Sequence, residues 1–405
     1  MTTHAPSFGQ AHPRQVDFGR ADSLITIDLD AITHNWRTLD SLSGGGTETA
    51  AVVKADGYGL GAPMIALPLA AAGCRTFFVM SLAEAVTLRT KLTEAGFADC
   101  RLFTLSGIHP GQEADFAAHH ITPVINGIEQ FQLLAQMAQR NGAPVSAAIH
   151  IDTGMTRLGL DRDEASWLCT AYEGGIDTVR GIAPCLLMSH LSASEDLDDA
   201  ASTRQLSAFT SWRDRLPAMP ASLANSGGSF LGARYHFDLI RPGIALYGLH
   251  PAGADMTGAQ HGESMALHPA VTWQARILQH RRAKAGDAVG YNGTYVVARD
   301  SRIATLGVGY ADGYPRSLGN RAKVDIGGNM APVVGRVSMD SITVDVTDID
   351  EAVVNEAGHA TVLGPPYPLA EMAKDAGTIG YEILTQLGQR PARRFKGGQT
   401  GQSRA

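Results

Sequence analysis

Short apolar runs alternate with amphipathic segments through the first 250 residues of the chain. Apolar runs of about four to eight residues are typical of strands buried in a parallel sheet, and apolar residues at helical spacing are typical of the helices that cover it. The strands predicted from this pattern are 24–29, 50–54, 77–80, 102–105, 122–125, 146–151, 181–189, 221–224 and 239–247. Asp30 is predicted to cap a first helix that runs through Trp36 and Leu39, and Ser81 with Glu84 is predicted to form a capping box at the start of a second helix. Further helices are predicted at 112–119, 129–140, 164–172 and 197–216.

Counted from Val52, the alternation gives about eight strand–helix units. This number favours a (β/α)8 TIM-like barrel. An open, doubly wound parallel sheet remains the alternative, because periodicity does not show whether a sheet closes. No G-x-G-x-x-G follows a predicted strand, which removes the main sequence support for a dinucleotide-binding fold.

The pattern changes after residue 262. Short strand-like runs separated by Gly, Asp and Asn predict a second, mostly β domain. These runs are 271–278, 288–289, 294–297, 303–306, 323–326, 332–334 and 342–346. We therefore expect a disordered leader at 1–21, a barrel at 30–262, a β-rich C-terminal domain at 263–392 and a loose tail at 393–405.

Composition narrows the class of protein. Of the 405 residues, 44% are hydrophobic and 18% charged, which is typical of globular domains with large cores. A net charge of -7 argues against general nucleic-acid binding, and no apolar run reaches membrane length. The first twenty residues lack the apolar centre of a secretory signal. The four cysteines form no CxxC pair, so we expect a reduced, cytoplasmic protein without a metal site.

Lys54 stands at the end of the predicted strand 50–54, before a glycine-containing turn. Buried lysines are rare unless they are paired or reactive. A lysine in a partly apolar pocket has a lowered pKa and can form a Schiff base. The alternative is a structural lysine whose ammonium group reaches the solvent at the rim. The strand alone does not decide between the two.

Other reactive side chains follow predicted strands, and a barrel places the C-terminal ends of its strands at one mouth. These residues are Tyr58, Asp152, Arg157, His190, Asn225, Ser226, Arg241 and Gly243. Each one alone could be structural, but together they favour a site. Barrels often bind a phosphate near their last two strands. A phosphate site beside a lysine able to form a Schiff base suggests pyridoxal 5'-phosphate.

Five motifs in fixed order resemble those of alanine racemases, which are fold-type III pyridoxal-phosphate enzymes. They are AVVKADGYG at 51–59, DTGMTRLG at 152–159, RPGIALYG at 241–248, GVGYADG at 307–313 and GRVSMD at 335–340. The resemblance extends from about residue 24 to 387. It implies interconversion of L- and D-alanine, supplying D-alanine for peptidoglycan, and it assigns residues 22–29 to the C-terminal domain.

The resemblance also implies roles for single residues. Lys54 would hold the cofactor and act as one base, and Tyr291 of the partner subunit in a head-to-tail homodimer would act as the other. Residues implied to bind the cofactor are Tyr58, His190, Asn225, Ser226, Arg241, Gly243, Ile244 and Tyr381. In this set, Arg241 would face the ring nitrogen and His190 would link Arg241 to the catalytic tyrosine. Residues implied to bind substrate or line its entrance are Arg157, Met339, Tyr310, Asp340 and Tyr381, with Met339 acting through its backbone in the other subunit.

One position departs from the family. His150 stands where many members carry a carbamylated lysine that steadies the substrate-binding arginine. Histidine cannot carry that group, so an anion or a water near Arg157 is one expectation, and a purely structural strand residue is the other. Three rival functions remain open from the sequence. They are a racemase of serine or of broad specificity, a fold-type III decarboxylase and a non-catalytic pyridoxal-phosphate carrier.

Overall fold

A computed structural model describes residues 16–196, 200–251 and 266–398 of the chain. Parts of the predicted leader, of the helix at 197–216 and of the tail lie outside these ranges. The chain divides into two compact units. One unit comprises Asp28–Ala270 with the segment from Phe395, and the other comprises the segment up to Ile27 with Val271–Arg394.

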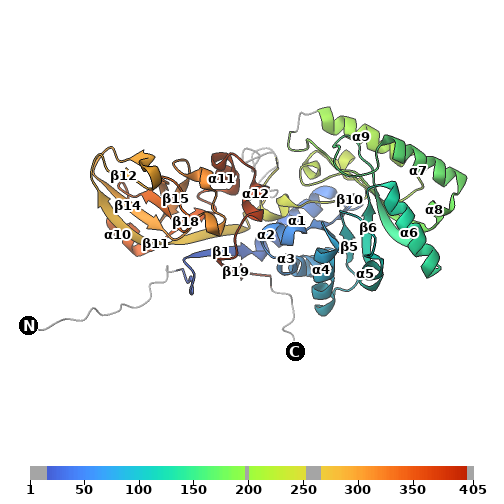
Figure 1. Cartoon of the computed structure of the whole chain (residues 1–405), viewed down its shortest axis with the longest axis horizontal. Helices are drawn as coiled ribbons and strands as arrows, with labels where there is room; N and C mark the ends of the chain where they lie inside the picture. The colour runs from blue at the N-terminus through green and yellow to red at the C-terminus, as the bar shows by residue number, and fades with distance from the viewer. Residues whose placement is uncertain (1–15, 197–199, 252–265, 399–405) are drawn as a thin grey trace, which may run out of the picture. The chain divides into compact units, whose positions relative to one another are not determined.

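The first unit alternates strands and helices along the chain (Figure 1). Its strands are β2 (Glu48–Thr49), β3 (Ala51–Val52), β4 (Thr76–Val79), β5 (Arg101–Thr104), β6 (Ile121–Ile125), β7 (Val145–His150), β8 (Ile182–Met188), β9 (Ala221–Ser222) and β10 (Leu239–Ile240). Its helices are α1 (Leu29–Ser43), α2 (Lys54–Gly59), α3 (Ala62–Ala72), α4 (Leu82–Glu94), α5 (Glu113–Ala118), α6 (Ile128–Asn141), α7 (Arg162–Gly174), α8 (Asp177–Arg180) and α9 (Ala200–Arg213). Three short 3-10 turns follow, η1 (Gly228–Phe230), η2 (Ala233–Tyr235) and η3 (Ile244–Tyr247).

Backbone hydrogen bonds close these strands into a barrel. Strands β3 to β9 form one parallel sheet in sequence order, and β10 pairs in parallel with β2. The N–H of Arg241 donates to Ala224 O at 2.9 Å, which joins the segments after β9 and β10. Beyond β2, Ala50 N donates to Ile240 O at 3.0 Å and Val52 N to Pro242 O at 2.9 Å. Since β2 and β3 continue one another, the ring is complete, and the predicted (β/α)8 barrel is confirmed.

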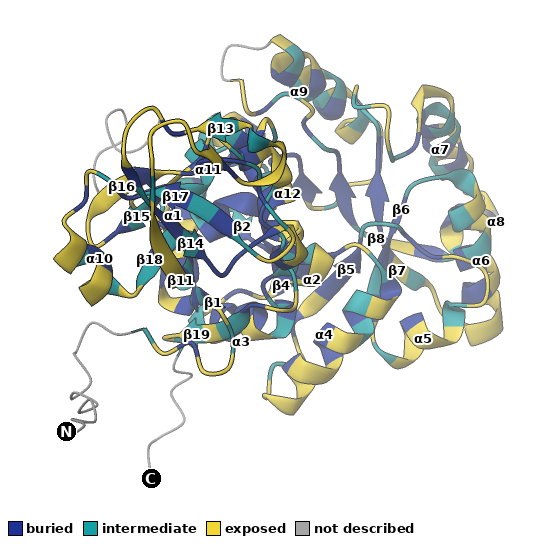
Figure 2. Ribbon diagram, turned by 60° about the vertical axis from the view of Figure 1, so that its left-hand side comes forward, coloured by how far each residue is buried: buried dark blue, intermediate teal, exposed yellow. Residues whose placement is uncertain are grey.

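Side chains fill the interior of the barrel. Residues from strands around the barrel form one buried apolar cluster. They are Ala50, Val52, Phe78, Phe103, Val124, Ala148, Leu186, Met188 and Leu239. Phe78 on β4 stacks on Phe103 of β5 with ring centroids 4.8 Å apart. Figure 2 shows the strands buried and the covering helices exposed on their outer faces. Burial on both faces explains why these strands are continuous apolar runs.

Side-chain hydrogen bonds cap the N-termini of helices α4 and α1. The Ser81 hydroxyl accepts from Glu84 N, and the Glu84 carboxylate accepts from Ser81 N, which is the capping box predicted for α4. Helix α1 begins two residues earlier than predicted from a cap at Asp30. Its cap is Asp28, whose carboxylate accepts from the N–H groups of Asp30 and Ala31 at 3.1 and 3.0 Å.

The second unit is mostly β. Its strands are β1 (Ser23–Asp28), β11 (Val271–Ala283), β12 (Ala288–Val289), β13 (Tyr295–Val296), β14 (Ser301–Leu306), β15 (Lys323–Ile326), β16 (Asn329–Pro332), β17 (Ile342–Asp345), β18 (His359–Leu363) and β19 (Ala392–Lys396). Its helices are α10 (Glu351–Ala357), α11 (Leu369–Ala376) and α12 (Gly380–Thr385), with 3-10 turns η6 (Tyr291–Gly293), η7 (Tyr310–Asp312) and η8 (Arg316–Leu318). One path through its large sheet runs β16-β15-β18-β11-β1-β19.

Long-range pairing organises this sheet. Strand β1 pairs antiparallel with β11, with Ile25 opposite Trp273. Trp273 is fully buried, and its ring meets that of Tyr314 edge-on at 5.9 Å. This tryptophan therefore serves as a core residue of the β unit.

Several local predictions were wrong or incomplete. Residues 243–247 were expected in the last barrel strand, but Ile244–Tyr247 forms the 3-10 turn η3. Residues 393–396 were expected in the loose tail, but Ala392–Lys396 forms β19, which pairs with β1. Strand β18 and helices α10, α11 and α12 were not predicted. No helix in the described ranges is long and apolar enough to cross a bilayer.

Candidate active site

Lys54 lies at the C-terminal end of a barrel strand, where it opens the turn 54–59. The four residues after it have left-handed backbone conformations, with φ of 53° at Ala55, 52° at Asp56, 64° at Gly57 and 58° at Tyr58. A left-handed conformation costs an L-residue about 1–2 kcal/mol. Consecutive strain of this kind persists only where the surrounding structure imposes it.

Two carboxylates hold this left-handed turn. Glu84 Oε1 accepts from Ala55 N at 2.7 Å, and Asp56 Oδ1 accepts from Ala62 N at 2.8 Å. The sequence identified Glu84 only as half of the capping box with Ser81. Glu84 also accepts the hydrogen bond from Ala55, the residue after Lys54. These two residues are 29 positions apart, so no local sequence pattern predicts the contact.

The environment of Lys54 favours its neutral amine. The side chain is half-buried, and desolvation lowers the pKa of Lys54. The positive charge of Arg157 lowers it further, while Glu84 opposes both effects. A lowered pKa increases the fraction of lysine present as the neutral amine near neutral pH, which is the form that acts as nucleophile or base. Partial burial and a lowered pKa are the properties that the reactive interpretation of Lys54 requires.

A donor-rich cradle lies where the chain leaves β10. Ser226 Oγ accepts from Gly243 N at 2.8 Å and from Ala245 N at 3.3 Å, which leaves its hydroxyl hydrogen as a donor for another group. A Cβ at position 243 would lie 2.1 Å from the Tyr58 hydroxyl, so only glycine admits this approach. The cradle unites the predicted Tyr58, Ser226, Gly243 and Ile244. Hydroxyls with backbone N–H groups are the donors that bind phosphate in proteins.

A buried hydroxyl next to the cradle has no hydrogen-bond partner within the described residues. It belongs to Tyr247, whose ring lies 4.9 Å from that of Tyr58. Burial raises the pKa of both tyrosines, so both stay protonated and act as donors. An unpaired buried hydroxyl costs free energy unless a bound group or water satisfies it.

Arg241 is buried behind the cradle. Its guanidinium donates to Ser222 Oγ, Ser189 O and Leu223 O. It also lies over the ring of Phe78, 6.0 Å from the centroid. Burial lowers the pKa of Arg241 to about 9, which still leaves it charged at neutral pH. Within the described residues no hydrogen bond joins Arg241 to His190.

His190 is instead held by Asn225. Asn225 Oδ1 accepts from Ser194 Oγ at 2.7 Å and from Gly228 N at 3.0 Å. Its amide nitrogen must therefore face His190 Nε2, 3.4 Å away, and donate to it. Desolvation and then the charge of Arg241 lower the pKa of His190 well below its usual value. His190 is consequently a neutral acceptor.

His150, at the end of β7, is fixed in a similar way. Its Nδ1 lies 2.8 Å from Asn126 Oδ1, and the Asn126 amide donates to Leu105 O and Val124 O. Since that amide nitrogen is already used, His150 Nδ1 carries the proton and donates. Burial and then Arg241 lower the pKa of His150 to about 3. Asn126 was missed from the sequence, although it directly follows the predicted strand 122–125.

Asp152 shapes the loop that carries Arg157. Its carboxylate accepts from the N–H groups of Gly154, Met155 and Thr156, each at 2.8 Å. The loop returns to β7 through a parallel bridge between Ile151 and Leu160. Arg157 itself is exposed. Of the predicted residues Asp152 and Arg157, the first therefore has a structural carboxylate, and the second has a guanidinium without a hydrogen bond to any other described residue.

The remaining predicted residues belong to the β unit. They are Tyr291 in η6, Tyr310 in η7, Met339 and Asp340 before β17, and Tyr381 in α12. Ala311 N donates to Met339 O at 3.0 Å, so η7 and the segment 338–340 are neighbours. The exposed fraction is 68% for Tyr291, 53% for Met339 and 44% for Tyr310. All three side chains are therefore accessible at the surface of the β unit.

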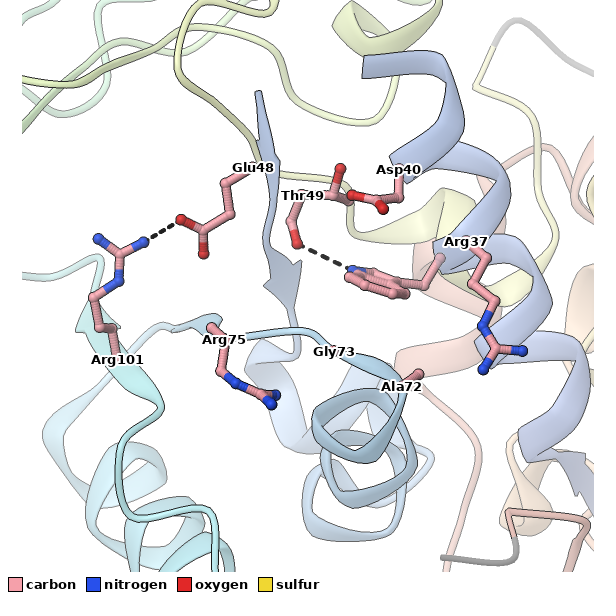
Figure 3. Close-up of a pocket in the computed structure, with 9 residues that line it drawn as sticks. Arg37, Asp40, Glu48, Thr49, Ala72, Gly73, Arg75 and Arg101 are labelled. Carbon is pink, nitrogen blue, oxygen red and sulfur yellow. Dashed lines mark hydrogen bonds and ion pairs between the residues drawn. The ribbon is translucent and has the colours of Figure 1, made fainter. Parts of the chain in front are cut away.

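A pocket of about 610 Å³ lies at the other end of the barrel strands (Figure 3). Glu48 and Arg101, which begin β2 and β5, form an ion pair on one side of it, and Arg37 of α1 lies on the other. None of the predicted site residues lines it. The predicted site residues of the barrel lie instead at the opposite end, where Lys54 follows β3.

Known proteins resemble this chain along most of its length. The model "Alanine racemase, N-terminal domain" matches residues 27–251, and "Alanine racemase, C-terminal domain" matches residues 270–395. An alanine racemase of Brucella canis is 43% identical over 378 residues, 92% of this chain and 93% of that protein. A catabolic alanine racemase of Agrobacterium fabrum is 41% identical over 382 residues, 94% of each chain. The crystal structure of alanine racemase from Bartonella henselae with covalently bound pyridoxal phosphate is 38% identical with a TM-score of 0.84, covering 93% of this chain and 100% of that one. The chain belongs to the alanine racemase family.

Proposed function

We propose that this chain interconverts L-alanine and D-alanine with pyridoxal 5'-phosphate as its cofactor. One observation carries the proposal: a half-buried lysine of lowered pKa stands at the same barrel mouth as a cradle suited to phosphate. Membership of the alanine racemase family supports the substrate. A lysine next to a phosphate cradle is the arrangement that pyridoxal-phosphate enzymes use.

The residues present fit the cofactor. Ser226, Gly243 and Ile244 with Tyr58 would hold its phosphate, while Lys54 would hold it covalently. The cradle that a Cβ at position 243 would fill and the unpaired Tyr247 hydroxyl are consistent with a bound group there. When bound, the cofactor supplies an electron sink for the electron pair left by the Cα proton. From the β unit, Tyr381 would add a further phosphate contact.

Three residues would face the cofactor ring, of which Arg241 is buried and His190 and Asn225 are half-buried. Arg241 would lie opposite the ring nitrogen, fixed by its bonds to Ser222, Ser189 and Leu223. A guanidinium donates but does not accept a proton, so it does not strengthen the electron sink as a carboxylic acid would. His190 and Asn225 would act as a neutral pair beside it, oriented by the Asn225 amide.

Racemisation needs a proton removed from one face of Cα and returned to the other. Lys54 would serve the face from which D-alanine loses its proton, and Tyr291 of the partner subunit would serve the L-alanine face. In each direction one base takes the Cα proton while the conjugate acid of the other donates one, so the charges balance. The exposed ring of Tyr291 supports a position at the surface that meets a second copy in a head-to-tail homodimer.

The substrate carboxylate would be held by Arg157 and by the backbone N–H of Met339 from the other subunit. Arg157 is available to bind the substrate carboxylate because the Asp152 carboxylate accepts hydrogen bonds from the loop backbone and not from the Arg157 guanidinium. Tyr310 and Asp340 would line the entrance. Neutral His150 near Arg157 would not repel it, unlike a protonated histidine.

Chiral analysis of the product tests the proposal. Purified protein reconstituted with pyridoxal 5'-phosphate is incubated separately with L-alanine, D-alanine and L-serine. Both alanine enantiomers should converge on an equal mixture, and serine should turn over more slowly. Release of CO2, or absence of turnover by a protein that shows the absorbance of bound cofactor, would defeat it. Lys54→Ala, which lacks the amine, serves as the inactive control.

We propose further that the product D-alanine supplies peptidoglycan synthesis in the cytoplasm. The four cysteines are free thiols, as expected in a reducing compartment. Expression in a bacterium that needs external D-alanine should restore growth without it. The Lys54→Ala chain, expressed to the same level, should not.

A further inference from the structure

Arg390 joins two acidic side chains of the β unit. Asp312, the last residue of η7, is only 2% exposed. Its carboxylate accepts from Arg390 Nε at 2.6 Å, from Arg390 Nη2 at 2.7 Å and from Gly309 N at 2.8 Å. Nη1 of the same guanidinium donates to Asp340. We call Arg390, Asp312 and Asp340 the Arg390 clamp.

The clamp acts on the segment 338–340. Tyr310 N donates to Ser338 O at 3.1 Å, and Ala311 N donates to Met339 O at 3.0 Å. Arg390 Nη2 lies 3.5 Å from the same Met339 oxygen. Backbone bonds therefore fix one side of the segment, and the guanidinium fixes its far end at Asp340. Met339 and Asp340 both remain largely exposed.

We propose that Arg390 is a positioning residue that presents the backbone of Met339 to the substrate. The inference rests on the proposed function, in which Met339 N–H binds the substrate carboxylate of the partner's site. Buried Asp312 anchors two nitrogens of the guanidinium, so the third reaches Asp340 in one defined direction. Arg390 itself touches no reacting atom and acts through the segment 338–340.

The geometry requires a guanidinium. Its planar fork can satisfy one carboxylate with two nitrogens and a second carboxylate with the third. A lysine keeps the positive charge but offers a single nitrogen, so it pairs with buried Asp312 and releases Asp340. The Arg390→Lys variant therefore distinguishes two roles of Arg390, one in which it must bind both carboxylates and one in which it only supplies a positive charge.

Steady-state kinetics of the reconstituted enzyme test the proposal. Arg390→Gln and Arg390→Lys should both raise KM for each alanine enantiomer about tenfold while kcat falls less, because a misplaced N–H weakens substrate binding. The matched control is Arg299→Gln, which breaks another exposed arginine–aspartate pair of the same unit, with Asp348. That control should keep the wild-type KM.

Two kinetic outcomes would overturn the inference. One is a KM within twofold of wild type in Arg390→Gln, or a wild-type KM in Arg390→Lys. The other is loss of activity together with loss of dimer mass or of the cofactor's visible absorption, which would show a general structural role.

Hydrogen exchange tests the Arg390 clamp independently of enzyme activity. Peptides covering 306–345 should exchange faster in Arg390→Gln than in Arg299→Gln, since the N–H groups of Tyr310 and Ala311 bond to the clamped segment. Equal exchange in the two variants would overturn the inference. A wild-type chain that does not racemise alanine would defeat the proposed function instead, and the exchange result would still stand.

Discussion

Single residues at the barrel mouth show how burial sets charge. His150 and His190 both lie among cations, and desolvation with the charge of Arg241 lowers the pKa of each. One asparagine fixes each ring: Asn126 accepts from His150, and Asn225 donates to His190. The mouth therefore combines cationic Arg241 and Arg157 with neutral imidazoles. Such a site attracts the phosphate and carboxylate groups that the proposed reaction requires.

The neutrality of His150 predicts how stability depends on pH. Its pKa is about 3 in the folded chain and about 6.5 when unfolded, so the unfolded state binds more protons between these values. Stability should therefore fall as pH falls through this window, by up to about 1.4 kcal/mol per pH unit for one histidine. Urea unfolding between pH 7 and pH 5 should give a shallower dependence for His150→Gln than for wild type. Equal slopes would contradict the assignment.

Tyr291→Phe tests the second base. The change keeps the ring and removes only the hydroxyl, so it should reduce racemisation by about 10²–10⁴-fold. Exchange of the Cα hydrogen in deuterated water should be lost from L-alanine but kept from D-alanine, because Lys54 still serves that face. Measuring exchange of each enantiomer by NMR separates the two faces. Equal loss from both enantiomers would refute the assignment of faces.

Among the elements, the left-handed turn 54–59 is the most constrained. Ala55, Asp56 and Tyr58 adopt a conformation that usually suits glycine, and the carboxylates of Glu84 and Asp56 compensate for it. The turn carries Lys54 at its start and the cradle tyrosine Tyr58 near its end. Backbone strain here thus places two site residues from one short segment.

Gly57→Ala tests the packing of this turn. An added Cβ would lie 2.7 Å from Ile65 Cδ1 and 3.0 Å from Ala62 N, so helix α3 would have to shift. We expect a loss of about 1–3 kcal/mol in the free energy of unfolding, together with weaker cofactor binding. Gly44→Ala is the control, since it also has positive φ but no atom within 4 Å of the added Cβ. The two variants should differ in stability, and matching losses would exclude the packing argument.

For the whole molecule, the proposed chemistry is divided between the two units. The barrel unit holds Lys54, the cradle and Arg157, and the β unit exposes Tyr291, Met339 and Tyr310. These exposed aromatic and methionine side chains are of the types enriched at protein–protein interfaces. Each complete site would then draw on two copies of the chain.

Mixing two inactive variants tests this division. In a heterodimer of Lys54→Ala with Tyr291→Phe, one of the two sites would receive both intact residues. Random reassociation should therefore restore about a quarter of wild-type activity to the mixture. The activity of co-refolded chains, compared with each variant refolded alone, checks it. No recovery in a mixture shown to contain heterodimers would place both bases in one chain.

The sequence alone determined the strand–helix alternation, the change to a β-rich texture after residue 262 and the residues that gather at the mouth. It could do so because buried parallel strands are continuous apolar runs and because barrel strands end at one face. The capping box of α4 was equally local, since Ser81 and Glu84 are three residues apart. The family motifs were also contained in short stretches of sequence.

Only the tertiary structure decided features that join distant segments. Closure of the barrel depends on bonds between residues 50 and 240, and the hold of Glu84 on Ala55 crosses 29 positions. The partners of Arg241 and His190 and the Arg390 clamp also join residues far apart in the chain. Periodicity records which face of a segment is buried, but it does not record which other segment buries it. The charge states of the mouth follow from that packing, because desolvation sets the pKa of each buried group.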